Sequence, residues 1–166
     1  MIIFETDRLF VRELEEQDLE PFIQINQDPD VMKHIGAPRS REEVIELVKK
    51  AQEMYAEKKG FGRWAVIEKA SGDYAGSFML RWSDKISGVE LGYSFLKEYW
   101  GKGYATELVL SGVEYAFNLD NVGEILAIVE KIHPTSEKVL RKSGFSFLRD
   151  YIENGIDLNV LAIRKK

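Results

Sequence analysis

Three successive strand-like runs, followed by a glycine-rich junction and a long helix, limit most strongly what this chain can fold into. The runs have β-favouring composition and lie at residues 63–68, 74–82 and 89–96. The turn at residues 70–73 joins the first two as a hairpin. The third run leads through Gly101 and Gly103 into residues 104–119, whose apolar positions have helical spacing. We therefore expect an antiparallel sheet whose last strand passes directly into a helix.

The segments on either side complete an α/β (α+β) order. Before the three runs we expect a strand at 4–14 and helices at 15–26, near 31–32 and at 40–59. Ser40 and Glu43 have capping-box spacing at the start of the last helix. After residue 119 we expect a strand at 124–132, a helix at 134–142 and strands at 145–150 and 158–164. This order predicts one domain, residues 1–166, with a mixed and mostly antiparallel sheet flanked by helices.

Composition excludes several classes of function. The 166 residues include no cysteine, so disulfides, thiolate metal sites and a cysteine nucleophile are ruled out. The two histidines, His34 and His133, are far apart in the sequence, and we expect no metal. A net charge of −5 disfavours binding to nucleic acid. Because no run of about 18 apolar residues occurs, we expect no membrane partner and a cytoplasmic location.

The glycine junction predicts an anion site. The first N–H groups of a helix have no partner within it and lie at its positive end. Gly101 and Gly103 lack a Cβ and would let a phosphate approach that backbone. The alternative is that the glycines serve only a tight turn. A dinucleotide fingerprint is disfavoured because Thr106 stands where its third glycine would be, and the chain contains no P-loop motif.

The same passage resembles a known family. Residues 100–105, Trp-Gly-Lys-Gly-Tyr-Ala, are similar to the pyrophosphate-binding motif of the GNAT superfamily of N-acetyltransferases. Three more stretches look like the branch that contains ribosomal-protein alanine acetyltransferases. They are Glu5–Leu14 (ETDRLFVREL), Asp28–Ile35 (DPDVMKHI) and His133–Phe145 (HPTSEKVLRKSGF). The four matches occur in the family's order and together span nearly the whole chain.

The resemblance implies a sheet of six or seven strands splayed into a V, with acetyl-CoA as co-substrate. The pantetheine arm would lie between residues 89–96 and 124–132, bound by main-chain groups of Ser94, Phe95 and Leu96. The pyrophosphate would rest on the main-chain amides of Gly101, Lys102, Gly103, Tyr104, Ala105 and Thr106. Because these contacts come from the backbone, blocking the approach at Gly103 should matter more than replacing the Lys102 side chain.

Three residues depart from the family pattern. Trp100 stands where the motif usually has Gln or Arg, which removes a polar side chain but leaves the backbone site. His133 stands where Asn is usual; it precedes Pro134 and is expected at a helix N-cap. The sequence leaves open whether His133 binds coenzyme A or only occupies the cap. Leu140 takes the position of a tyrosine that acts as an acid in many members.

Acetyl transfer to an amine needs a base for the amine proton and an acid for the leaving thiolate. Glu90 is the first candidate base, because it shares a strand face with small residues and partial burial would raise its pKa; a solvated edge glutamate is the alternative. Asp150 and Glu153 are second choices. Ser136 matches a family serine and could protonate the thiolate, although holding coenzyme A or serving in the first helical turn are equally open roles.

These observations predict an enzyme that transfers an acetyl group from acetyl-CoA to a primary amine, by direct attack in a ternary complex. The acceptor would be a protein N-terminal α-amine or a small-molecule amine, and the protein would be a monomer or a homodimer. The alternative is a non-catalytic sensor or regulatory protein that binds acyl-CoA. Loops decide the acceptor in such a fold, so the sequence leaves its identity open.

Overall fold

The computed structural model, which describes residues 1–166, contains one eight-stranded sheet with strands from both ends of the chain. The strands are β1 (Ile2–Glu5), β2 (Leu9–Arg12), β3 (Gly62–Glu68), β4 (Tyr74–Ser83), β5 (Gly88–Phe95), β6 (Glu124–Glu130), β7 (Ser146–Glu153) and β8 (Ile156–Arg164). Their spatial order is β1-β2-β3-β4-β5-β6-β8-β7. Only the β5–β6 pair is parallel. The predicted mixed, mostly antiparallel α/β sheet is confirmed.

The strand count differs from the expected six or seven because residues 4–14 are not one strand. The chain reverses after β1, and β2 pairs with β1 antiparallel. Thr6 makes this turn: its Oγ1 accepts the N–H of Leu9 at 2.9 Å, and its own N–H donates to the Leu9 carbonyl at 2.9 Å. The alternation of side chains continues across such a short turn, so the pattern alone did not reveal it.

Five helices and two 3-10 turns complete the chain. The helices are α1 (Leu19–Gln27), α2 (Pro29–Met32), α3 (Arg41–Glu57), α4 (Tyr104–Phe117) and α5 (Pro134–Lys142), and the 3-10 turns are Glu16–Asp18 and Lys97–Tyr99. The predicted cap of α3 is confirmed, since the Oγ of Ser40 accepts the N–H of Glu43 at 3.2 Å. The predicted bounds of α5 are also those observed.

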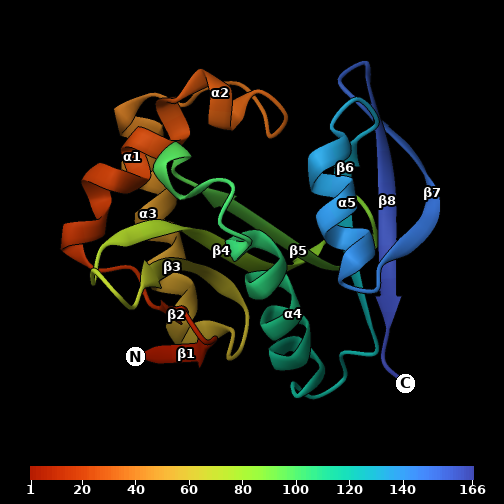
Figure 1. Cartoon of the computed structure of the whole chain (residues 1–166), viewed down its shortest axis with the longest axis horizontal. Helices are drawn as coiled ribbons and strands as arrows, with labels where there is room; N and C mark the ends of the chain where they lie inside the picture. Colours follow the sequence, from red (N-terminus) through yellow and green to blue (C-terminus); the bar gives the residue numbers. More distant parts are fainter.

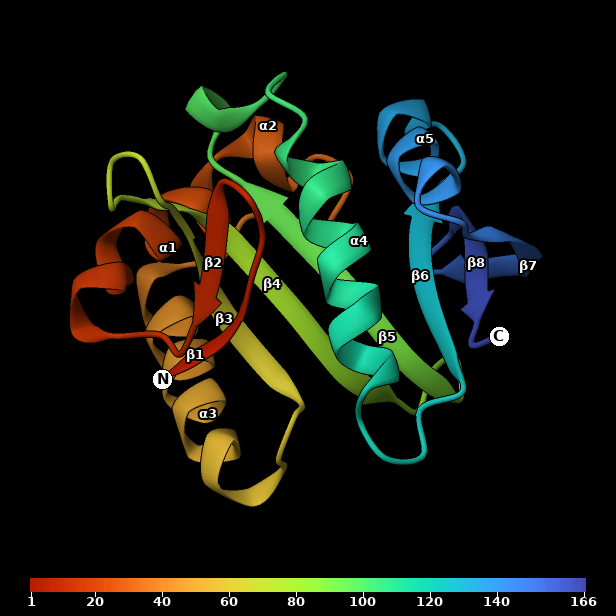
Figure 2. The same cartoon turned by 60° about the horizontal axis from the view of Figure 1, so that its bottom comes forward.

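Helices cover both faces of the sheet (Figures 1 and 2). Helices α1 and α3 pack on β3 and β4 at one face, whereas α4 lies across the other face and contacts α5. Trp64 and Phe78 are fully buried in the resulting core. Helix α4 approaches the sheet closely at Gly112, where a Cβ would stand 2.6 Å from Cζ of Phe78. The missing side chain therefore sets how near α4 can lie.

The two parallel strands diverge. Strand β5 pairs with β6 only through Val89 with Ile125 and Glu90 with Leu126. Figure 2 shows the two strands close together where they begin and apart toward their C-terminal ends, with α4 in front. The edge of β5 that faces β6 is thus without a strand partner from residue 91 onward. This is the splayed V that the family resemblance implies.

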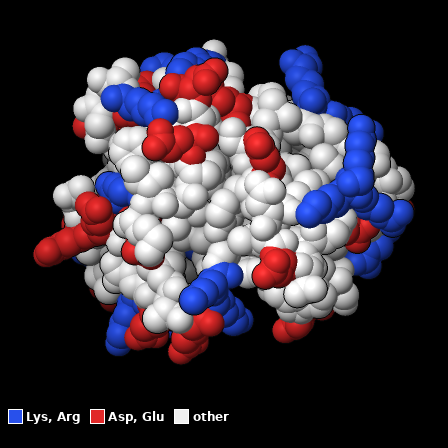
Figure 3. Space-filling model, turned by 90° about the horizontal axis from the view of Figure 1, so that it is seen from below, with Lys and Arg blue, Asp and Glu red and all other residues white.

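None of the helices combines the length and the apolar composition that a membrane span requires. On the face seen in Figure 3, acidic and basic side chains are interspersed around a broad uncharged area.

Candidate functional site

The glycine junction exposes a row of unused backbone donors at the start of α4. Gly101 and Gly103 have φ of 75° and 79°, in the left-handed region that favours glycine. The first hydrogen bond of the helix runs from the Glu107 N–H to the Gly103 carbonyl at 3.3 Å. The amides of residues 101–106 make no hydrogen bond within the protein, and no atom lies within 4 Å of a Cβ built on Gly101. Free amides at the start of a helix are suited to hold a phosphate, and the binding at these six residues that the family resemblance implies stays a prediction.

Two cations adjoin the junction. The Arg8 guanidinium lies over the ring of Tyr104, 4.5 Å from its centre, and its NH2 is 3.5 Å from a Cβ built on Gly103. Arg8 also pairs with Glu107 through a bond of 2.8 Å. Lys102 Nζ is 3.8 Å from a Glu68 carboxylate oxygen. Sequence reasoning missed Arg8, because nothing local in the β1–β2 turn connects it with a helix almost a hundred positions later.

The main-chain groups predicted to hold the pantetheine arm lie at the open end of β5. Two of them already have partners. The Leu96 N–H donates to the Ala75 carbonyl at 2.9 Å, and the Phe95 carbonyl accepts the Trp100 indole N–H at 2.9 Å. Trp100 therefore replaces the family's polar side chain with a brace between the junction and β5. Ser94 is next to these groups, on the half-buried part of the strand.

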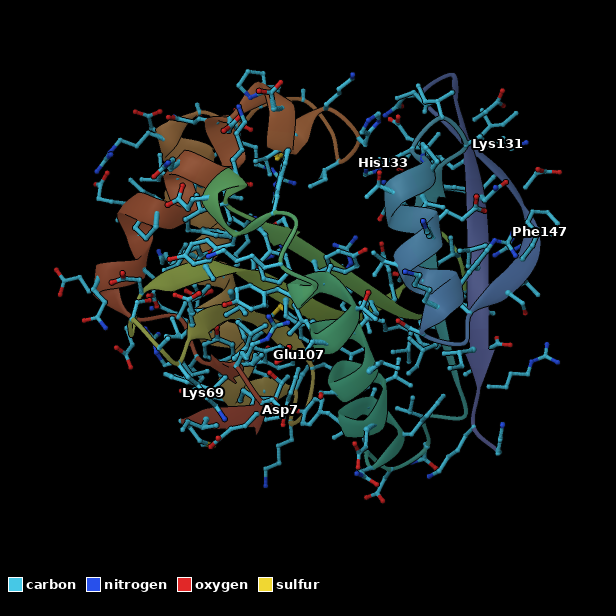
Figure 4. The ribbon with its side chains drawn as sticks, in the orientation of Figure 1. Asp7, Lys69, Glu107, Lys131, His133 and Phe147 are labelled. Atoms are coloured by element: carbon cyan, nitrogen blue, oxygen red, sulfur yellow. The ribbon has the colours of Figure 1, made fainter.

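His133 lies at the N-cap of α5, as expected, but its side chain makes no cap hydrogen bond. Its ring instead stacks on His34, with ring centres 4.0 Å apart and planes at 17°. His34 Nδ1 lies 2.8 Å from an oxygen of Glu130, the last residue of β6. Figure 4 shows His133 facing the loop that follows α2, so these rings connect the two arms of the V. Burial, and then the charge of His34, lower the pKa of His133.

Ser136 lies against Tyr93, a strand residue that the sequence patterns did not single out. The Tyr93 hydroxyl and the Ser136 Oγ are 3.1 Å apart, across the opening between β5 and α5. Burial raises the pKa of Tyr93, against the smaller opposite effect of the Ser136 hydrogen bond, so the phenol stays protonated. The signal that could have found it is the one hydroxyl group in the apolar stripe Val89, Leu91, Tyr93 and Phe95. Leu140 is 1% exposed and belongs to the core.

Glu90 lies on the opposite face of β5 from Tyr93, as strand alternation requires. Its side chain is 12% exposed, and an oxygen accepts from Nε of Arg81 at 3.0 Å. The second-choice bases lie elsewhere, on β7. Asp150 pairs with Lys131 at 2.7 Å and is largely exposed, and Glu153 pairs with Lys85. Of the three carboxylates, only Glu90 adjoins the point where β5 and β6 separate.

No three His, Asp or Glu side chains are grouped so that they could hold a metal ion. The site offers free amides, the cations Arg8 and Lys102, hydroxyl groups and one partly buried carboxylate.

Comparison with known proteins agrees with this geometry. A family model described as an acetyltransferase (GNAT) domain matches residues 8–146. The uncharacterized N-acetyltransferase YoaA of Bacillus subtilis (strain 168) is 30% identical, over 98% of this chain and 97% of its own.

Solved structures share the fold at lower identity. A spermidine N-acetyltransferase from Vibrio cholerae, in complex with CoA and spermine, has a TM-score of 0.78 at 22% identity and 95% coverage of both chains. An acetyl transferase from Salmonella typhimurium that modifies the N-terminal serine of 50S ribosomal subunit protein L7/L12 has a TM-score of 0.82 at 15% identity and 100% coverage of both chains. From its motifs, its splayed sheet and these matches, the chain belongs to the GNAT family of acetyltransferases.

Proposed function

We propose that this acetyltransferase uses acetyl-CoA and transfers its acetyl group to a primary amine within a ternary complex. The observation that carries the proposal is the row of unused amides at residues 101–106, at the positive end of α4 and beside the open edge of β5. The neighbour from Vibrio cholerae, which was solved with CoA, supports the same ligand here. We take residues 1–166 as one catalytic domain, because a single sheet includes strands from both ends of the chain.

The reaction needs two proton movements. The amine nitrogen attacks the thioester carbon, the carbon–sulfur bond breaks, and the amine loses a proton while the sulfur gains one. Glu90 is the proposed acceptor of the amine proton. Ser136 is the proposed donor to the thiolate, with the protonated phenol of Tyr93 behind it at 3.1 Å. Bound acetyl-CoA supplies the activated acetyl group, so no nucleophile of the protein is required.

Two amine classes follow from the neighbours' own activities, a polyamine and a protein N-terminus. The test is thiol release from acetyl-CoA with a panel of polyamines, short peptides, amino acids and other small amines. Wild-type protein should release thiol with at least one acceptor, and Glu90→Gln should lower kcat by roughly 10²–10⁴-fold. Glu114→Gln, an exposed change on α4, is the matched control and should keep full activity.

Saturable coenzyme A binding without turnover on the whole panel would assign the chain to the non-catalytic sensors instead. An unchanged rate in Glu90→Gln would remove Glu90 as the base.

A further inference from the structure

A partly buried arginine without a carboxylate partner lies on the same sheet face as Glu90. Arg63 of β3 makes one side-chain hydrogen bond, from NH2 to the sulfur of Met79 at 3.2 Å, and forms no ion pair. Arginine pairs normally with carboxylates in this protein. Ion pairs with Glu or Asp occur at Arg8, Arg12, Arg41, Arg81, Arg141 and Arg164. The Arg63 side chain is thus held in the fold with most of its five N–H donors unused.

Strand register places Arg63 near the proposed acceptor position. Arg63 is opposite Met79, and Met79 is opposite Gly92 of β5. Two pairs further along, Arg81 is opposite Glu90. All of these residues lie on the face covered by α1 and α3, because positions two apart on a strand share a face. The Met79 side chain lies between Arg63 and β5, since its Cε is 3.0 Å from a Cβ built on Gly92 and its sulfur contacts Arg63 NH2.

The electrostatics around Arg63 are uncompensated. Burial, followed by the positive charges of Arg39 and Arg81, lowers the pKa of Arg63 to about 10. The Arg39 guanidinium donates to the side-chain oxygen of Asn26 at 2.7 Å, which carries no charge. Glu90 is engaged by Arg81. Arg63 is therefore repelled by two other guanidinium groups, and the carboxylate that acts on it, Glu90, is already paired with Arg81, so a further anion would reduce this repulsion.

Buried hydroxyl groups continue the polar surface of this face. The Tyr74 hydroxyl and the Ser77 Oγ are both buried and have no hydrogen-bond partner. Ser77 is opposite Ser94 of β5. Burial raises the pKa of Tyr74 well above its ordinary value, so its hydroxyl remains a donor. Tyr74 and Ser77 are three positions apart, but the β3–β4 register shifts between Val66 and Ile67 and brings both to the face of Arg63. Unused donors thus extend from Arg63 along this face.

We propose that the acceptor carries a carboxylate close to its amine, and that Arg63 binds this carboxylate while Glu90 faces the amine. The inference rests on the proposed function. A guanidinium binds a carboxylate through two parallel hydrogen bonds, which satisfies donors that the free protein leaves unused. The acceptor class is then a small amino acid with both charges. A polyamine would bring several positive charges toward three arginines and is disfavoured.

The test uses thiol release with amino acids, each paired with its own carboxamide, and with spermidine. In wild-type protein kcat/KM should be roughly 10–100-fold higher for the acid than for the amide of the best pair, the range expected for hydrogen bonds to a charged group. Arg63→Met, unbranched and neutral, should bring this ratio to near one, mainly through a higher KM for the acid. Arg63→Lys should restore part of the ratio, and Arg164→Gln, an exposed control, should leave it unchanged.

Several outcomes would overturn the inference while leaving acetyl transfer intact. The carboxylate site is contradicted if wild-type protein is equally active on acids and amides. It is also contradicted if the protein prefers spermidine or peptide N-termini without a nearby carboxylate. An equal fall in kcat for acids and amides in Arg63→Met would assign Arg63 to the thioester instead.

A second measurement uses wild-type protein alone and does not depend on the folding of Arg63→Met. In the presence of coenzyme A, an N-acetyl amino acid should raise the melting temperature of wild-type protein more than its N-acetyl amide. Equal shifts would contradict the proposed carboxylate site. Absence of thiol release with every amine would contradict the proposed function itself.

Discussion

Replacing Gly103 with alanine separates two effects that this residue combines. Its φ of 79° forces an L-residue into the left-handed region, which costs about 1–2 kcal/mol. A Cβ at this position meets no protein atom nearer than Arg8 NH2 at 3.5 Å, so steric strain inside the protein is small. The added methyl would instead stand where a phosphate must approach the backbone. We expect a modest loss of stability together with at least about tenfold weaker binding of acetyl-CoA, or ~1.4 kcal/mol.

Gly72 provides the matched control. Its φ of 77° is nearly the same, and a Cβ built there has no atom within 4 Å. It belongs to the β3–β4 hairpin, whose Glu68 side chain contacts Tyr104 and Lys102 of the junction, but a methyl group on Gly72 itself would point into open space. Gly72→Ala should therefore lose about the same 1–2 kcal/mol of stability and bind acetyl-CoA like wild type.

Thermal unfolding with and without ligand measures both quantities. At a ligand concentration of 100 times the wild-type Kd, binding stabilises wild-type protein by about 2.7 kcal/mol and a tenfold weaker binder by about 1.4 kcal/mol. At ~2–4 °C per kcal/mol for a protein of this size, Gly103→Ala should lose roughly 3–5 °C of the ligand-induced rise in Tm. Calorimetric titration with coenzyme A gives Kd directly. If both alanine variants bind coenzyme A as tightly as wild type, the diphosphate does not rest on this backbone.

Three further predictions concern packing, pH and catalysis. Gly112→Ala places a methyl group 2.6 Å from Cζ of Phe78. Overpacking of about 1–3 kcal/mol should outweigh a gain in helix propensity of ~1 kcal/mol. Chemical denaturation of the variant with and without Phe78→Leu should show that the smaller leucine side chain restores stability. Burial acts to raise the pKa of Glu107, but hydrogen bonds from the β1–β2 turn outweigh burial and lower that pKa. The ionised Glu107 side chain therefore contributes fully to stability above the ordinary glutamate pKa of about 4.3. This contribution is lost as pH falls through the lower pKa of the folded state. Glu107→Gln should flatten this acid limb in pH-dependent denaturation, and an unchanged limb relative to Glu114→Gln would refute the assignment. Tyr93→Phe should lower kcat by about tenfold or more with little change in KM or Tm, measured by thiol release and thermal unfolding, and full activity would exclude the phenol from proton delivery.

Most elements could be predicted from local residue patterns. The cap at Ser40, the helix that begins at Pro134 and the hairpin at 70–73 all depend on neighbouring residues, and the structure agrees with each. The reversal at Thr6 was missed because its turn leaves the side-chain alternation unbroken. A local pattern depends on the identity of neighbouring residues and contains no information on the direction in which the chain continues.

The candidate site was only partly predictable. The junction at 101–106 was found because glycines between a strand and a helix have a local physical meaning. A role for Tyr93 was not predicted, since it shares the apolar face of its strand with Val89, Leu91 and Phe95. The contact with Ser136 joins positions 43 apart in the sequence, and nothing near either residue points to the other.

Glycine spacing, capping residues and apolar periodicity thus predicted most of the secondary structure and a helix start with free backbone amides, because each acts over a few residues, whereas the family was indicated by motif resemblance. The tertiary structure decided which side chains meet: His34 with Glu130, 96 positions apart, and Arg63 with no carboxylate at all. Such pairings follow from strand register and from the separation of β5 and β6, and these arise only when distant segments pack together.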